Sequence, residues 1–131
     1  MNDCIFCKIV NGDIPCYKVW EDEDFLAFLS INPPAEGLTL VRPKKHQPSY
    51  FAHVDNTVLS ELIKRAKVVA EILDTKLEGV MRTKLVLEGL EVDHLHAKLY
   101  PMYKNREESF RYSKVKATPK DLEGTHLKLT S

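Results

Sequence analysis

The chain has 131 residues with 19 basic and 19 acidic side chains, so its formal net charge is zero. A hydrophobic fraction of 44% and a charged fraction of 29% are typical of a folded domain and exclude a disordered one. The balanced charge predicts no nucleic-acid partner, because it offers no basic field to a phosphate backbone. No apolar run approaches the ~20 residues of a membrane span, which predicts no membrane partner. We expect one domain over residues 1–131.

The cysteines and the first residues indicate the compartment. Three cysteines are an odd number, which favours free thiols or metal ligands over disulfides. The residues from Met1 to Cys4 carry neither the basic nor the apolar segment of a signal peptide. We therefore expect a cytoplasmic protein.

The apolar pattern predicts two helical segments and five strands. A short helical turn is expected within residues 4–10, and a long helix over residues 58–73, where apolar residues recur at a spacing of three to four. The five strands are expected at residues 17–20, 25–31, 38–41, 83–87 and 92–100, with Pro101 closing the last one. This order predicts an α+β fold with a mostly antiparallel sheet and a polar tail from about residue 105. One long helix covers only one sheet face, so a homodimer is expected to cover the other face or an edge.

The segment around two closely spaced histidines carries the strongest chemical signal. Side chains alternate along a strand, so His94, His96, Lys98 and Tyr100 are expected on one face, opposite an apolar face. An imidazole can attack phosphorus while its neighbour orients it, and an ammonium can hold charge on a phosphoryl oxygen. The alternative is an ordinary polar sheet face without chemistry.

A second signal is the pair Cys4 and Cys7. Two thiolates at this spacing suit tetrahedral zinc, which then needs two more ligands from histidines. The candidates for those ligands are His46, His53, His94, His96 and His126. A redox pair is less favoured because no strand precedes the motif, and two buried structural thiols are the other alternative.

Together these motifs resemble the histidine triad (HIT) superfamily of nucleotide hydrolases and transferases. The resemblance runs from residue 4 to about 103, through CIFCKIVNGDIP at 4–15, WEDE at 20–23, FLSINP at 28–33, GLTLVRPKKH at 37–46 and HLHAKLYP at 94–101. It implies a five-stranded antiparallel sheet in a homodimer that joins two sheets into one.

The resemblance also implies residue roles. His96 takes the position of the nucleophile, which attacks the α-phosphate and forms a covalent nucleotidyl intermediate, and His94 takes the first triad position. In zinc-carrying members the ligand positions correspond to Cys4, Cys7, His46 and His94, so a structural zinc ion is expected. In members without metal, His46 and His94 relay charge to the nucleophile.

The chain departs from the family pattern on the substrate side. Lys98 stands in the third triad position, where it keeps a positive charge but does not accept a proton at neutral pH. Leu38, Ser30 and Leu90 replace a histidine, a ribose-binding aspartate and a glutamine. The expected substrate-binding residues are Phe6, Leu29, Ser30, Ile31 and Glu91.

Two functions are consistent with this pattern. The first is a HIT enzyme of altered specificity, with His96 as nucleophile, His94 in support and Lys98 as the phosphate-clamping cation. Its substrate is a nucleotide or phosphate ester, namely a phosphoramidate, phosphoanhydride or phosphodiester. The second is a catalytically impaired nucleotide-binding or regulatory protein with the same fold. An unrelated α+β domain with an accidental match is the third alternative.

Overall fold

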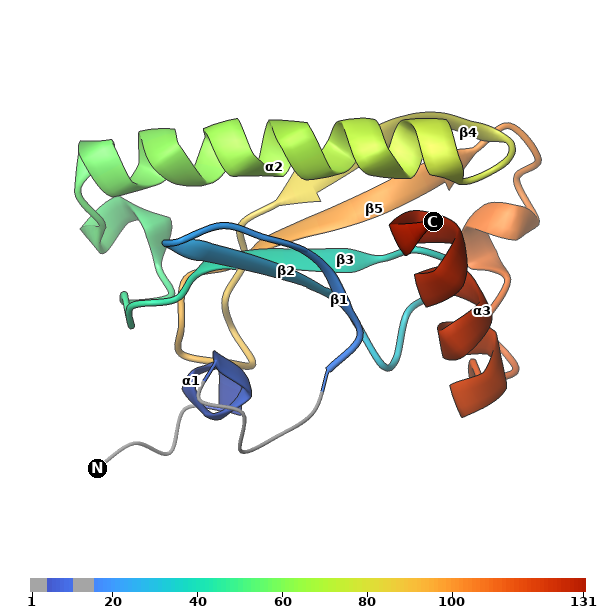
Figure 1. The fold of residues 1–131 in the computed structure, drawn as a ribbon, viewed down its shortest axis with the longest axis horizontal. Helices are drawn as coiled ribbons and strands as arrows, with labels where there is room; N and C mark the ends of the chain where they lie inside the picture. The colour runs from blue at the N-terminus through green and yellow to red at the C-terminus, as the bar shows by residue number, and fades with distance from the viewer. Residues whose placement is uncertain (1–4, 11–15) are drawn as a thin grey trace.

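Five antiparallel strands form one sheet in the order β1-β2-β3-β5-β4 in the computed structural model, which describes residues 5–10 and 16–131 (Figure 1). The strands are β1 (Lys18–Glu21), β2 (Phe25–Leu29), β3 (Thr39–Pro43), β4 (Val80–Val86) and β5 (Ala97–Tyr103). The helices are α1 (Ile5–Val10), α2 (Asn56–Lys76) and α3 (Pro119–Thr130), with short 3₁₀ helices η1 (Phe51–His53) and η2 (Glu108–Phe110). The predicted α+β class with five strands is confirmed.

Helix α2 covers one face of the sheet (Figure 1). Its buried residues, Leu62, Ala66, Val69 and Leu73, follow one another at three- or four-residue spacing and join the main core. The helix is longer than the predicted 58–73, because the apolar stripe continues into Leu77, which is 3% exposed. Within the described part of the chain, no helix combines the length and apolar character that crossing a membrane requires.

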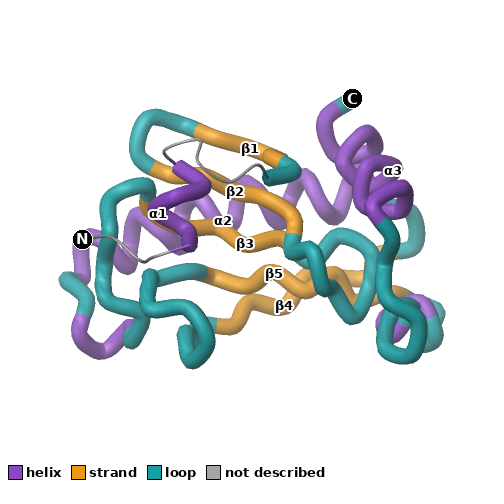
Figure 2. Tube along the Cα trace, turned by 90° about the horizontal axis from the view of Figure 1, so that it is seen from below, coloured by secondary structure: helices purple, strands orange, loops and turns teal. Residues whose placement is uncertain are grey.

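Helix α1 lies on the opposite face, in front of β2 and β3 in Figure 2, where α2 runs behind the sheet. Ile9 of α1 packs against Leu26 and Phe28 of β2, in a second, smaller apolar cluster. Val92, from the loop before β5, belongs to the same cluster. This packing brings Cys7 of α1 beside the start of β5.

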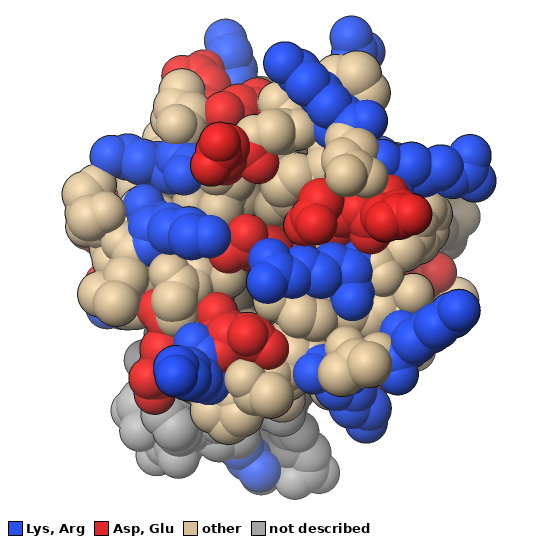
Figure 3. Space-filling view, turned by 90° about the vertical axis from the view of Figure 1, so that its right-hand side faces the viewer, with Lys and Arg blue, Asp and Glu red and all other residues tan. Residues whose placement is uncertain are grey.

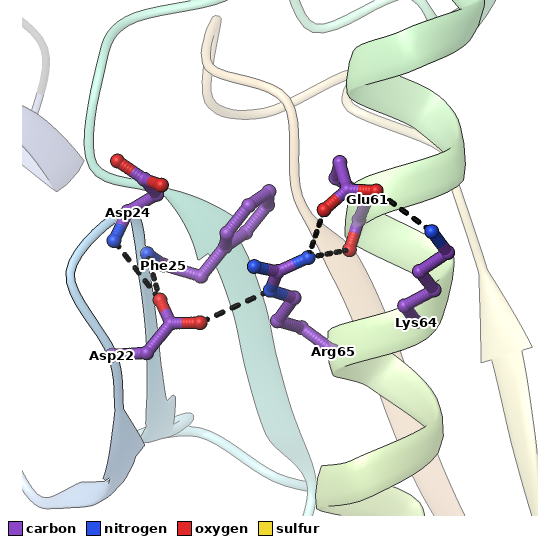
Figure 4. A network of polar contacts seen from close by, with 6 residues as sticks. All are labelled: Asp22, Asp24, Phe25, Glu61, Lys64 and Arg65. Atoms are coloured by element: carbon purple, nitrogen blue, oxygen red, sulfur yellow. Dashed lines mark hydrogen bonds and ion pairs between the residues drawn. The ribbon is translucent and has the colours of Figure 1, made fainter.

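An ion-pair network ties α2 to the turn between β1 and β2 (Figure 4). The Nε atom of Arg65 donates to Asp22 at 3.0 Å, and a second guanidinium nitrogen donates to Glu61 one helical turn earlier. Asp22 also accepts from the backbone N–H groups of Asp24 and Phe25, so the same carboxylate shapes the turn. The acidic turn between β1 and β2 is therefore a docking point for the long helix.

The polar tail contains a helix, α3, that was not predicted from the sequence. Thr118 and Asp121 form a reciprocal capping box at the start of α3, and the helix packs against α2 and β1. Leu122 and Leu129 are its buried apolar residues. On this side of the molecule, basic and acidic side chains are interspersed (Figure 3).

The predicted strand over residues 92–100 is wrong at both ends. Strand β5 begins at Ala97, because its ladder with β3 ends at the pair Val41 and Ala97, and Pro43 has no N–H to extend it. At the other end, Pro101 lies inside β5 instead of closing it. It lies beyond Leu99, the last residue paired with β3, so β5 has a ladder neighbour on one side only and tolerates a missing N–H there.

Candidate functional site

A cavity of about 500 Å³ opens over β3 and β5 on the sheet face opposite α2. Its floor follows the pairing of the strands, in which Leu40 of β3 lies beside Lys98 of β5. The lining residues are Ser30, Asn32, Pro34, Leu38, Leu40, Glu91, Val92, His96, Lys98 and Tyr100. One imidazole, one ammonium and the carboxylate of Glu91 therefore share a cavity whose walls mix polar and apolar side chains.

His96 is 4% exposed and lies one residue before β5. Its Nδ1 atom is 2.6 Å from the backbone oxygen of His94, and a carbonyl can only accept, so Nδ1 carries the proton. The lone pair is then on Nε2. Burial lowers the pKa of His96 despite that hydrogen bond, and the nearby Lys98 ammonium acts in the same direction. The ring is neutral at physiological pH, as a nucleophile must be.

Two residues along, Lys98 supplies the positive charge of the cavity. Its Nζ atom is 3.4 Å from a carboxylate oxygen of Glu88, in the loop after β4. Farther along β5, the Nζ atom of Lys84 on β4 lies over the ring of Tyr100, 4.8 Å from the ring centroid. Glu88 and Lys84 were not predicted. Only the pairing of β4 with β5 brings them here, and the sequence gives no register for it.

His94 does not line the cavity and forms a separate cluster with Cys7 and His46. The Sγ atom of Cys7 is 3.4 Å from Nδ1 of His46 and 3.4 Å from Nδ1 of His94. All three potential ligand atoms lie within 4.8 Å of one another. Cys7 and His94 are buried, whereas His46 is exposed. The histidine rings meet edge-on, with centroids 4.9 Å apart.

The far side of the His94 ring contacts a buried guanidinium. Nε2 of His94 is 2.8 Å from the backbone oxygen of Pro43, and Arg42 brings Nη2 to 2.8 Å and Nε to 3.2 Å of the same atom. Burial first, and then the Arg42 charge, lower the pKa of His94 to about 4. The ring is therefore neutral at physiological pH, the state in which imidazole binds metal ions.

The cluster fits a thiophilic divalent ion such as zinc. Zn–S and Zn–N bonds of about 2.3 and 2.0 Å at a tetrahedral angle put sulfur and nitrogen about 3.5 Å apart, close to both distances seen here. A proton on Nε2 of His94, donated to Pro43, leaves Nδ1 able to bind the ion, which is the usual arrangement of a metal-bound histidine. Arg42 opposes that arrangement, because a guanidinium can only donate to Nε2.

The predicted site residues fall into separate groups. His96, Lys98, Ser30 and Glu91 line the cavity, whereas Cys7, His46 and His94 form the sulfur–nitrogen cluster. His94 and His96 both precede β5, whereas Lys98 and Tyr100 lie on it, so only part of the expected run of four residues belongs to the strand. Leu29 packs in the main core and Ile31 is 64% exposed, and neither lines the cavity. Cys4 and the side chain of Phe6 lie outside what the structure describes.

Comparisons with known proteins agree with this arrangement. A family model described as the HIT domain matches residues 11–105. The chain is 40% identical over 116 residues to an uncharacterized HIT-like protein of Methanocaldococcus jannaschii, covering 86% of this chain and 89% of that protein. It is 36% identical over 98 residues to adenosine 5'-monophosphoramidase of Schizosaccharomyces pombe, covering 75% of this chain and 73% of that enzyme.

The fold is also similar to that of solved structures. A hypothetical histidine triad nucleotide-binding protein of Sulfolobus tokodaii superposes with a TM-score of 0.83 and 29% identity. The match covers 97% of this chain and 89% of that one. The sequence resemblance is confirmed by both kinds of comparison, and the chain belongs to the histidine triad (HIT) family.

Proposed function

We propose that this protein is a hydrolase or transferase of nucleotide phosphates that acts through a covalent intermediate on His96. The observation that carries the proposal is the hydrogen bond from Nδ1 of His96 to the backbone oxygen of His94. It fixes the tautomer in which Nε2 holds the lone pair, on a ring that lines the cavity. The phosphoramidase activity named for the yeast relative supports the same substrate class.

Each of these residues has its own role in the proposed reaction. The Nε2 lone pair of His96 forms a bond to phosphorus as the bond to the leaving group breaks, and the leaving group departs with that electron pair. The proton on Nδ1 stays in its bond to the His94 oxygen, which stabilises the positive charge that the ring gains. Lys98 neutralises a phosphoryl oxygen. Water or another acceptor then attacks phosphorus and releases His96.

A structural zinc ion is part of the proposal. Cys7, His46 and His94 would hold it, with Cys4 as the expected fourth ligand. Such an ion supplies binding free energy to the fold and no chemical step, because closed four-coordinate sites leave no position for substrate. It would join α1 to the loops that follow β3 and precede β5.

A catalytically impaired binding protein is the second candidate. Leu38 is 6% exposed and lines the cavity at a position where the family pattern has a histidine. Lys98 also removes one proton-accepting ring. Both changes leave a cavity that can hold a phosphate group while offering fewer groups that can move a proton.

Turnover by paired variants tests the proposal. Wild type, His96→Ala and His53→Ala are assayed on an adenosine phosphoramidate, a dinucleoside polyphosphate and a non-nucleotide phosphodiester. His53 lies exposed on η1, outside the cavity lining, and is the matched control. We expect His96→Ala to abolish turnover while keeping its melting temperature, and His53→Ala to match wild type. Wild type quenched in alkaline denaturant, which preserves a phosphorus–nitrogen bond, should carry a nucleotidyl mass on the chain.

Two results would count against it. Nucleotide binding without turnover by folded wild type would favour the binding-protein alternative. Turnover that survives His96→Ala would remove His96 as the nucleophile.

A further inference from the structure

The loop between β2 and β3 forms one wall of the cavity that His96 lines. Four of the lining residues belong to this loop, namely Ser30, Asn32, Pro34 and Leu38. At the base of the loop, the backbone N–H of Ser30 donates to the oxygen of Leu38 at 3.0 Å. The contacts that hold the tip of the loop, around Pro34, come from the end of β5 and from the C-terminal tail.

Glu36 is the residue of this loop to which the tail attaches. Its side chain is 13% exposed, and one carboxylate oxygen accepts from Thr125 at 2.8 Å and from Lys128 at 2.9 Å, both on α3. The other carboxylate oxygen is 3.7 Å from the guanidinium of Arg111. We call these three contacts of Glu36 the tail clamp. Two cations and a hydroxyl meet one carboxylate, so the clamp depends on the charge of Glu36.

Two hydrogen bonds to the backbone of the loop support the tail clamp. The backbone N–H of Tyr112, in the segment that leads into α3, donates to the oxygen of Pro34 at 2.8 Å. The hydroxyl of Tyr103, the last residue of β5, donates to the backbone oxygen of Glu36 at 2.6 Å. The tip of the loop is therefore held by the sheet and by the tail at the same time.

Helix α3 is itself fixed to the rest of the fold, so it can hold the loop in place. Leu129 belongs to the main core, and the helix stands at one end of the sheet (Figure 1). Nε2 of His126 is 2.8 Å from the backbone oxygen of Lys18 on β1 and donates to it. The family model matches residues 11–105. The helix that holds the loop therefore lies outside the part of the chain that carries the family motifs.

We propose that Glu36 is a positioning residue for substrate binding, through which the tail clamp holds one wall of the cavity in place. This rests on the proposed function, because it takes the cavity as the substrate site. His96 and Lys98 are positioned by β5, whose ladders with β3 and β4 do not include the loop. Loss of the clamp therefore weakens substrate binding and raises KM, while kcat stays the same. With the clamp in place, a ligand does not have to order this wall as it binds.

Reversing one charge of the tail clamp tests the assignment in steady-state kinetics. The side chain of Lys128 is 54% exposed, so Lys128→Glu opens no core cavity and places a second carboxylate against Glu36. Lys120→Glu makes the same change at an exposed position of α3 outside the clamp, and Lys128→Arg keeps the charge. We expect Lys128→Glu to raise KM for an adenosine phosphoramidate about tenfold, the typical effect of losing one charge-assisted contact, with kcat unchanged. The other two variants should match wild type. A fall in kcat alone, an unchanged KM or an equal effect of Lys120→Glu would overturn the assignment.

Amide hydrogen exchange separates this inference from the proposed function, because it needs no substrate. The N–H of Tyr112, bonded to Pro34, reports on the tail clamp, and the N–H of Leu95, bonded to Gln47 outside the loop, is the reference. We expect Lys128→Glu to speed exchange at Tyr112 and not at Leu95. Unchanged exchange at Tyr112 would overturn the clamp whatever the turnover result. Wild type that cleaves no substrate would refute the proposed function, and the exchange rates together with the Kd for AMP would then decide on the clamp.

Discussion

Removing the His46 imidazole from the cluster of Cys7, His46 and His94 should make the stability of the fold independent of metal. In His46→Ala the two sulfur–nitrogen contacts of 3.4 Å become one. His46 is exposed, so the truncation opens no cavity in the core and any loss of stability reports the missing ligand. Metal present at about a hundredfold over its Kd adds about 2.7 kcal/mol to the free energy of unfolding. For a chain of this length that corresponds to roughly 10 °C in Tm.

The assay combines metal content with thermal unfolding, with and without a chelator. Wild type should contain about one zinc ion per chain and lose about 10 °C when the ion is removed. His46→Ala should start near the lower value and respond little to chelator, while His53→Ala should behave as wild type. Wild type that melts at the same temperature in chelator would refute the metal centre. Equal losses in His46→Ala and His53→Ala would show that the effect is not one of ligation.

Three further perturbations follow from the structure. Lys98→Met should lower kcat/KM about tenfold or more. It should change Tm little, because the 3.4 Å ion pair of Lys98 with the half-exposed Glu88 contributes about 1 kcal/mol or less to stability. Kinetics and thermal melting of the same variant measure both effects. Gly37→Ala should lower the free energy of unfolding in urea by more than about 2 kcal/mol. The φ angle of Gly37 is +95°, and a new Cβ would clash with a methyl carbon of buried Leu77. An unchanged urea midpoint would contradict this. Burial alone would raise the pKa of Asp22, but Arg65 and two backbone N–H groups outweigh it and lower the pKa, so its stabilisation is present above about pH 4 and lost below. Asp22→Asn should therefore lower Tm at pH 6 and not at pH 2, and an equal loss at both would refute the linkage.

The order of the helices and strands up to β5 could be predicted from the sequence, because that part of the order follows from local signals. The apolar stripe of α2 needs only its own residues, and the strands before it are bounded by prolines and an acidic turn. The pattern missed α3, although Thr118, Pro119 and Asp121 form a capping signal, because few apolar residues follow it. What fixes α3 is contact with Glu36, more than eighty residues earlier.

The start of β5 shows a second limit. Alternation of His94, Leu95, His96 and Ala97 is consistent with a strand, and periodicity cannot tell where a ladder ends. The ladder ends where the partner strand ends, and here the partner reaches Pro43. The burial of Arg42 could not be predicted either, because a basic residue beside a proline suggests an exposed turn. In the structure, Arg42 is 0% exposed and contacts His94.

Because β5 begins only at Ala97, His94 and His96 precede it and have different surroundings. In a continuous strand their rings would point the same way, about 7 Å apart, into one environment. Here the His94 ring contacts Cys7 and Arg42, whereas its backbone oxygen accepts the proton of His96. The residue that joins the sulfur–nitrogen cluster thereby also sets the tautomer of the ring in the cavity. In the proposed mechanism, a constraint on the His94 ring would act on the His96 lone pair through one residue of backbone, so an ion held by the cluster would also help to orient the proposed nucleophile.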